Sequence, residues 1–330
     1  MPLSPISFSL EELEGAEALV RRHVPPTPQH RWPLLEQRLG CPVIVKHENH
    51  TPLGAFKIRG GLTFMDWLKH RHPEVRGVVC ATRGNHGQSV AFAARQAGLA
   101  CVIVVPRGNS VEKNAAMRAL GGELIEAGED FQESLEEAQR LASERGLHPM
   151  PSYHAELVRG VASYGLELFR AAPELERVYV PIGLGSGVNA VAAARDALGL
   201  DCEVIGVVSA QAPAYQLSFE QGEIVEAPAA TRLCDGMACR TPNPEAMEGI
   251  WRSAARVVAV RDAEVAEAMR LYFSATHNVA EGAGAAALAA AWQEGQDPER
   301  AIGVVLSGGN VDRPLYGRVL AGESFEVETA

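Results

Sequence analysis

Residues 77–105 read GVVCATRGNHGQSVAFAARQAGLACVIVV, and this stretch decides the fold class. Two runs rich in β-branched residues, Gly77 to Cys80 and Cys101 to Val105, lie on either side of a segment with helical spacing from about Gly87 to Gly98. Strands that alternate with helices in this way form parallel sheets with helices on both faces. We therefore expect a doubly wound α/β fold.

The same alternation extends in both directions along the chain. Pro149 and Pro151 interrupt it between Gly146 and His154, which predicts two series of elements. A chain of 330 residues also suits two domains better than one. The other predicted elements are strand Val43 to Lys46 and helix Gly60 to His70; helix Val111 to Leu120, strand Glu123 to Glu126 and helix Phe131 to Arg145; then helix Leu157 to Phe169, strand Val178 to Pro181, helix Asn189 to Leu198, strand Glu203 to Val208, helices Val265 to Ala275 and Ala283 to Trp292, and strand Ala301 to Leu306.

The composition argues against several classes of partner and site. The formal net charge is -11 and the acidic residues are spread along the chain, so we expect neither a nucleic-acid nor a membrane partner. Met1 to Val20 carries four glutamates and lacks a basic segment followed by an apolar one, which predicts a cytoplasmic protein without a secretory signal. No C-x-x-C pair is present, so we expect reduced thiols and no metal site. The cysteines are Cys41, Cys80, Cys101, Cys202, Cys234 and Cys239.

Three glycine-rich turns directly follow predicted strands, where ligands of parallel sheets bind. In Ala81 to Gln88, backbone amides at a helix start can bind a carboxylate. In Gly183 to Gly187, consecutive amides favour a phosphate, although the turn matches neither of the common nucleotide-binding glycine patterns. In Leu306 to Asn310, a hydroxyl can hydrogen-bond a ring nitrogen. Each turn, taken alone, could also be an ordinary connection between elements.

Lys57 lies in TPLGAFKIRGG, residues 51–61, an apolar and glycine-flanked setting. Desolvation lowers the pKa of an amine, which lets a lysine act as a nucleophile and hold a carbonyl cofactor as a Schiff base. A lysine at a helix start more often lays its stem on apolar neighbours and keeps its ammonium group in water. The three turns favour the interpretation that Lys57 holds a carbonyl cofactor.

Four ordered motifs resemble those of the serine/threonine dehydratase and serine racemase group of fold type II pyridoxal-phosphate enzymes, whose fold is similar to that of the tryptophan synthase β chain. The likeness runs from about Pro25 to Asp312, nearly the whole chain. The motifs are Phe56-Lys57, Gly84-Asn85-His86-Gly87, the glycine turn at Gly183, and Ser307-Gly308-Gly309-Asn310.

The resemblance implies a domain arrangement and a cofactor. A large domain from residues 1–77 and 157–330 would bind pyridoxal 5'-phosphate. A small domain from residues 78–156 would close the active site, which would lie in the cleft between the two. A homodimer is the usual arrangement in this group.

The resemblance also implies roles for the matched residues. Lys57 would hold the cofactor and take the α-proton of the substrate, and Ser307 would face the pyridine nitrogen. Phe56 would pack near the cofactor ring, and Asn85 would contact its 3'-oxygen. The implied phosphate cradle is Gly183, Leu184, Gly185, Ser186, Gly187, Val188 and Asn189; Gly236 and Glu281 would also line the cofactor; Thr82, Arg83, Gly84, Asn85 and His86 would contact the substrate.

The implied reaction is a β-elimination. A β-hydroxy amino acid such as L-threonine or L-serine would yield a 2-oxo acid and ammonia. Because Ser307 is neutral, the ring nitrogen need not be protonated, which favours prompt loss of the β-hydroxyl. Relatives of the dehydratase type usually carry glycine where this chain has Leu184 and Ser186, so substrate placement here could differ.

Arg83 departs from the pattern. Racemases of the group carry a serine at this position, where it returns a proton to Cα, and arginine is a poor proton donor because its pKa exceeds about 12. We therefore expect little racemase activity. Arg83 could instead bind a second carboxylate, as in 3-hydroxyaspartate, or it could simply face solvent. The stretch Ser209 to Tyr215, where some relatives bind a divalent cation, contains no acidic residue.

Two other classes remain open on the residues alone. A nicotinamide dehydrogenase would also be doubly wound, but Gly183 to Gly187 lacks its glycine fingerprint and Lys57 would have no role. A non-catalytic binding protein on the same fold would be expected to have lost Lys57.

Overall fold

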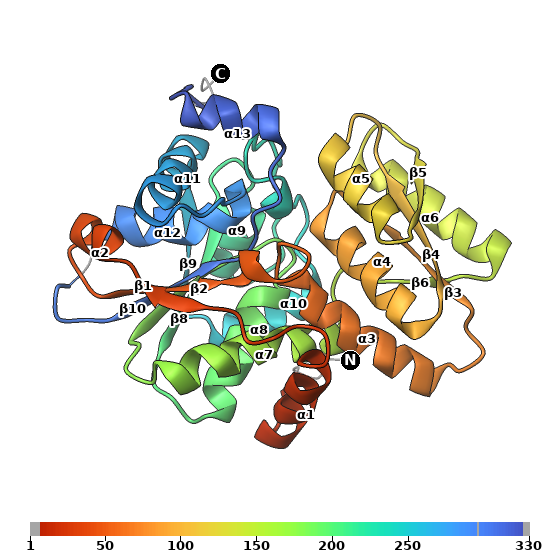
Figure 1. Ribbon diagram of the computed structural model, residues 1–330, viewed down its shortest axis with the longest axis horizontal. Helices are drawn as coiled ribbons and strands as arrows, with labels where there is room; N and C mark the ends of the chain where they lie inside the picture. Colours follow the sequence, from red (N-terminus) through yellow and green to blue (C-terminus); the bar gives the residue numbers. More distant parts are fainter. Residues whose placement is uncertain (1–6, 296, 326–330) are drawn as a thin grey trace.

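The computed structural model describes residues 7–295 and 297–325 and contains two separate β-sheets (Figure 1). The larger sheet has the strand order β1-β2-β10-β7-β8-β9, and all its pairs are parallel except β1 with β2. The smaller sheet has the order β5-β4-β3-β6 and is parallel throughout. This arrangement confirms the predicted α/β class. The strands are β1 (Gln29–Arg31), β2 (Val43–His47), β3 (Gly77–Ala81), β4 (Ala100–Val105), β5 (Glu123–Glu126), β6 (His148–Pro149), β7 (Arg177–Pro181), β8 (Glu203–Ser209), β9 (Arg256–Val260) and β10 (Ile302–Leu306).

Helices cover both faces of each sheet, and in Figure 1 the two helix-covered sheets lie side by side. None of the helices within the described residues is long and apolar enough to cross a membrane. The helices are α1 (Leu10–Val20), α2 (Pro33–Leu39), α3 (Lys57–Arg71), α4 (Asn85–Ala97), α5 (Val111–Ala119), α6 (Phe131–Arg145), α7 (Ala155–Ala171), α8 (Ser186–Ala197), α9 (Ala214–Gln221), α10 (Pro244–Ser253), α11 (Asp262–Thr276), α12 (Gly282–Glu294) and α13 (Arg313–Leu320), with short 3-10 helices η1 (Glu48–His50) and η2 (Asp235–Met237).

Alternate side chains of the larger sheet enter two different cores. Val178 and Val180 of β7 lie in the core formed with α7 and α8, whereas Tyr179 between them lies in the core formed with α11 and α12. Side chains of β8 and β10 alternate in the same way. Because both faces are buried, these strands are nearly continuous apolar runs, which is why the sequence predicted them well.

The smaller sheet is built on the same principle. Val78 and Cys80 of β3 pack with α3 and α4, and Val79 packs with α6 on the other face. Helix α3 also packs against α7, which covers the larger sheet. Helix α3 therefore joins the two halves of the molecule, and Lys57 is its first residue.

Helix α3 begins three residues before the predicted start at Gly60. The adjacent glycines Gly60 and Gly61 suggested a helix boundary, but their role is close packing inside the helix. A Cβ atom on Gly60 would lie 2.6 Å from the backbone oxygen of Leu157 in α7, and one on Gly61 would lie 2.2 Å from Ser89 Oγ in α4. Only glycine lets both neighbouring helices come this close to α3.

Candidate functional site

The sequence motifs converge where the strands of the larger sheet end. The backbone N–H of Phe56 donates to the carbonyl of Ser307 at 3.1 Å, which joins the start of α3 to the turn after β10. Lys57 Nζ donates to Ser186 Oγ at 3.1 Å, which joins it to the turn after β7. Residues about 120 to 250 positions apart in the chain thus meet around one amine.

Lys57 differs from the other lysines in its surroundings. The chain has four lysines; Lys46 is paired with Glu167, Lys113 is paired with carboxylates, and Lys69 is at the surface. Lys57 is half-buried, and among the described residues it has no carboxylate partner. Burial therefore lowers the pKa of Lys57 from about 10.5 to about 8. An amine with this pKa is partly neutral near neutral pH and can act as a nucleophile or a base.

The glycine turn after β7 forms a concave set of amides at the start of α8. Gly185 is the N-cap in a left-handed conformation (φ 92°), and a Cβ on Gly183 would lie 2.3 Å from the carbonyl oxygen of Gly236. The first N–H groups of a helix have no acceptor within it. Those of Ser186, Gly187 and Val188 are therefore free to bind an anion.

Asn189 departs from the predicted cradle. Its backbone N–H already donates to the carbonyl of Gly185 at 3.1 Å within α8. Its side-chain amide donates to Tyr153 Oη at 2.8 Å and to the carbonyl of Ala246 at 3.0 Å. The Asn189 side chain therefore ties the turn to Tyr153 and α10, and Leu184 in the turn is half-buried.

Asn85 is held by two polar partners. Its Nδ2 donates to Glu281 Oε1 at 2.6 Å, and its Oδ1 accepts from Asn310 Nδ2 at 2.9 Å. Glu281 is buried, and a Cβ on Gly308 would lie 2.3 Å from Glu281 Oε1. This packing fixes the orientation of Asn85 at the start of α4.

The turn before α4 is organised by Thr82. Thr82 Oγ1 accepts from the backbone N–H groups of Gly84 at 3.1 Å and Gly87 at 3.3 Å. The N–H groups of Asn85 and His86, the first two residues of α4, are left available for an anion.

His86 and Arg83 of this turn lie in contrasting environments. His86 Nε2 is buried and has no hydrogen-bond partner among the described residues. Burial, together with the nearby charge of Lys57, lowers the pKa of His86 to about 3, so this imidazole is neutral. Arg83 is exposed and forms no ion pair within the described part of the chain.

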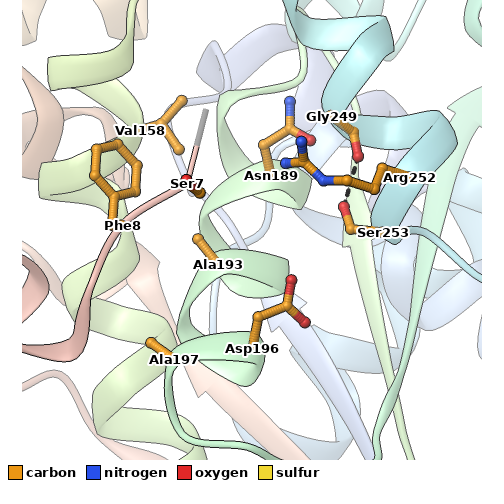
Figure 2. Close-up of a pocket in the computed structure, with 10 residues that line it drawn as sticks. All are labelled: Ser7, Phe8, Val158, Asn189, Ala193, Asp196, Ala197, Gly249, Arg252 and Ser253. Atoms are coloured by element: carbon orange, nitrogen blue, oxygen red, sulfur yellow. Dashed lines mark hydrogen bonds between the residues drawn. The ribbon is translucent and has the colours of Figure 1, made fainter. Parts of the chain in front are cut away.

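A separate cavity of about 180 Å³ lies along α8, and Lys57, Asn85 and Ser307 do not line it. Figure 2 shows the Asn189 side chain at its wall, together with Phe8, Val158 and Arg252. No group of three or more potential metal-binding side chains occurs among residues 7–295 and 297–325.

Three polar residues of the site were not predicted. Lys113 and Asp235 form an ion pair beside Glu281, and Tyr153 supports Asn189. No local pattern marks Lys113, because α5 looks like an ordinary surface helix. Asn310 lay inside a recognised motif, and its amide could have been proposed as a partner for Asn85.

Comparisons with known proteins show what the whole chain is similar to. Residues 20–308 match the family described as pyridoxal-phosphate dependent enzyme. The chain is 31% identical to L-threonine ammonia-lyase of Thermotoga maritima, over 95% of this chain and 78% of that protein. It is 28% identical to L-threo-3-hydroxyaspartate ammonia-lyase of a Pseudomonas species, over 98% of this chain and 100% of that protein. The processed form of threonine deaminase isoform 2 from Solanum lycopersicum superposes with a TM-score of 0.87 at 26% identity, over 97% of this chain and 91% of that one.

Proposed function

We propose a substrate for this chain, which belongs to the family of pyridoxal-phosphate-dependent enzymes. The proposed substrate is a small β-hydroxy amino acid such as L-threonine or L-serine. The chain is an ammonia-lyase of fold type II that carries out β-elimination. The observation that carries the proposal is the half-buried amine of Lys57 at the start of α8, whose first N–H groups have no acceptor within the helix, together with a neutral serine at a strand end.

The described residues fit the cofactor at three points. The N–H groups of Ser186, Gly187 and Val188 suit its phosphate, because they lie at a helix start without internal acceptors. The lowered pKa of Lys57 suits capture of a carbonyl. The buried hydroxyl of Ser307 suits a ring nitrogen, since it can donate or accept without adding charge.

Different residues of this chain have different roles in the reaction. Bound pyridoxal phosphate supplies a conjugated ring that withdraws electrons from the α-carbon of the substrate. Lys57 takes the α-proton at Nζ, because its amine lies at the site and is partly neutral. The N–H groups of Asn85 and His86 bind the substrate carboxylate. The β-hydroxyl leaves as hydroxide, which together with the proton taken by Lys57 amounts to one water. The released product then takes up one water and gives a 2-oxo acid and ammonia.

A panel of amino acids tests the proposal. Wild-type protein loaded with pyridoxal phosphate is assayed for 2-oxo acid and ammonia with each β-hydroxy amino acid, and Lys57→Ala is the control. We expect equal amounts of the two products from L-threonine or L-serine, and none from the variant. Retained turnover in Lys57→Ala, or no turnover of any β-hydroxy amino acid by the wild type, would reject the proposal.

A second candidate substrate is 3-hydroxyaspartate, which has one more carboxylate. The guanidinium of Arg83, in the Thr82 to His86 turn, favours it, because it is exposed and has no ion pair among the described residues. If Arg83 binds that carboxylate, Arg83→Ala lowers kcat/KM for threo-3-hydroxyaspartate by about tenfold or more and leaves that for threonine nearly unchanged. An unchanged ratio would show that Arg83 has no such role. A measurement that separates D-serine from L-serine should find little D-serine formed from L-serine by the wild type, because Arg83 is a poor proton donor to Cα.

We also propose the arrangement of the whole protein. The large domain comprises residues 1–77 and 157–330, the small domain comprises residues 78–156, and the active site lies between them. The two sheets, which use strands from different parts of the chain, support this division. A homodimer is proposed from the family resemblance, and a cytoplasmic location from the sequence. The mass of the protein in solution is measurable by light scattering.

A further inference from the structure

Helix α5, which belongs to the smaller sheet, is tied to segments that follow the strands of the larger sheet. Three hydrogen bonds from the first turn of the helix and its N-cap make this connection. They join Ser110 Oγ to Asp312 Oδ1, Glu112 Oε1 to the backbone N–H of Arg313 at 3.0 Å, and Lys113 Nζ to Asp235 Oδ2 at 2.6 Å.

Lys113 is the buried member of this set. Its side chain is 7% exposed, and its Nζ lies 2.6 Å from Asp235 Oδ2 and 3.4 Å from Glu281 Oε2. Its stem lies directly on the turn that precedes α4, because a Cβ on Gly84 would be only 2.5 Å from Lys113 Cδ. Burial lowers the pKa of Lys113, but Glu281 and Asp235 outweigh burial and raise it, so the ammonium form persists.

The ammonium group of Lys113 favours the ionised form of Glu281. Its Oε1 accepts from Asn85 Nδ2 at 2.6 Å, while its buried Oε2 has no hydrogen bond among the described residues and faces Lys113. Burial raises the pKa of Glu281, Lys113 opposes the rise, and Asp235 adds to it. Burial raises the pKa of the Cys234 thiol, and Glu281 is one of the carboxyl groups that add to this rise. Lys113 is therefore the one cation near Glu281 among the described residues.

We infer that Lys113 is a positioning residue: its ammonium group is the charge partner of Glu281, which in turn holds Asn85 in place at the start of α4. Lys113 itself touches neither Lys57 nor Asn85 through a hydrogen bond. Lys113 acts through Glu281. The Lys113–Glu281 pair links α5, beside the smaller sheet, to the start of α12, beside the larger sheet. The kinetic part of this inference rests on the proposed function, whereas binding of the cofactor does not.

Two substitutions separate the charge of Lys113 from a merely mechanical tie. Lys113→Met and Asp235→Asn both break the Lys113–Asp235 pair, so a mechanical tie would make them behave alike. Their charge effects on Glu281 are opposite. Removing the cation should raise the pKa of Glu281 further, whereas removing the neighbouring anion should lower it. Asp235 is 42% exposed, so its substitution should leave the fold intact.

The sign of the expected shift follows from the role of Glu281. The ionised carboxylate is the stronger acceptor for Asn85, so function is lost as pH falls through the pKa of Glu281. We expect the acid midpoint to move up by about one pH unit or more in Lys113→Met and down in Asp235→Asn. Glu112→Gln, which alters another α5 contact without touching Glu281, is the matched control and should leave the midpoint in place.

The experiment measures this midpoint in two ways. One is the pH dependence of kcat for β-elimination by each holoenzyme. The other is the pH dependence of the dissociation constant of pyridoxal phosphate for each apoprotein, which needs no substrate. Opposite shifts in the two variants support the inference. Shifts in the same direction, or no shift in either, overturn it. If no variant or wild type shows turnover, the proposed function fails and the binding measurement still decides the role of Lys113.

Discussion

Lys57 gains its reactivity from what surrounds it. Of the four lysines, Lys46 and Lys113 are buried against carboxylates, whereas Lys57 has only the Ser186 hydroxyl within hydrogen-bonding distance among the described residues. Its Nζ also lies 4.9 Å from the centre of the Phe56 ring. Desolvation without a compensating negative charge is the reason that the pKa of Lys57 falls to about 8.

This pKa predicts how the apoprotein captures its cofactor. Capture of a carbonyl needs the neutral amine, so the capture rate should rise with pH up to about 8 and then level off. An ordinary exposed lysine would show a rate that keeps rising toward about pH 10. Stopped-flow absorbance after mixing apoprotein with pyridoxal phosphate, over a series of pH values, distinguishes the two profiles. A rate that still increases tenfold between about pH 9 and pH 10 contradicts the assignment.

Among the elements, the glycine turn before α8 depends on its backbone conformation rather than on the chemistry of any side chain. A Cβ on Gly183 would meet the backbone oxygen of Gly236 at 2.3 Å, so the turn would have to shift. We expect Gly183→Ala to weaken pyridoxal-phosphate binding by about tenfold or more, equal to about 1.4 kcal/mol. Gly317→Ala, in open space on α13, is the control and should leave binding unchanged. Equal affinities, measured by equilibrium dialysis, would contradict the cradle.

A buried ionic cluster joins β2, α3 and α7 behind the site. Arg59 donates to Glu48 and to Glu167, and Lys46 Nζ lies 2.6 Å from Glu167 Oε2. Arg59 is two residues after Lys57 in α3 and fully buried. The cluster, whose charges balance, fixes the start of α3 against the larger sheet.

Removing one charge of this cluster should destabilise the protein strongly. Glu167→Gln leaves Lys46 and Arg59 with a single carboxylate, and such an uncompensated buried charge costs about 3–5 kcal/mol. Glu14→Gln, which breaks an exposed pair with Arg170, should cost less than about 1 kcal/mol. Urea unfolding near pH 7 measures both. Similar losses for the two variants would contradict the role of the cluster.

The pH dependence of this contribution has a definite sign. Burial raises the pKa of Glu167, but Arg59 and Lys46 outweigh burial and lower it. The stabilisation is therefore present at neutral pH and is lost in acid as Glu167 becomes protonated. The difference between wild type and Glu167→Gln should shrink as the pH falls below about 4.

The long apolar strands could be predicted because both faces of each are buried, as the alternation of Val178, Tyr179 and Val180 between two cores shows. Short or half-exposed elements could not. Strands β1 and β6 have three and two residues, and β9 has a partly exposed pattern. Helix α10, from Pro244 to Ser253, was not among the predicted elements.

The motifs predicted roles for Lys57, Asn85 and Ser307 because each lies at an end of an element in a recognisable pattern: Lys57 and Asn85 begin helices, and Ser307 follows β10. The structure adds what local patterns cannot contain. Lys113 and Asp235 are 122 residues apart, and they meet only because α5 reaches across to η2. Asn189, in contrast, matched a motif but turned its side chain toward Tyr153.

At the scale of the whole molecule, the site is assembled from both sheets. Lys57, Ser186 and Ser307 come from segments around the larger sheet, whereas Asn85 and Lys113 come from helices of the smaller one. Helix α3 packs on both halves and carries Lys57 at its start. The hydrogen bonds that cross between the two halves at the site are those from Asn85 to Glu281 and from Asn310 to Asn85.

The central claim is that Lys57 holds the cofactor. Borohydride reduction of the protein loaded with pyridoxal phosphate converts the imine to a stable secondary amine, which mass spectrometry of a digest can locate. The chain has four lysines, so the assignment is unambiguous. We predict one modified peptide, carrying the label on Lys57. Label on Lys46, Lys69 or Lys113, or no label at all, would contradict the account.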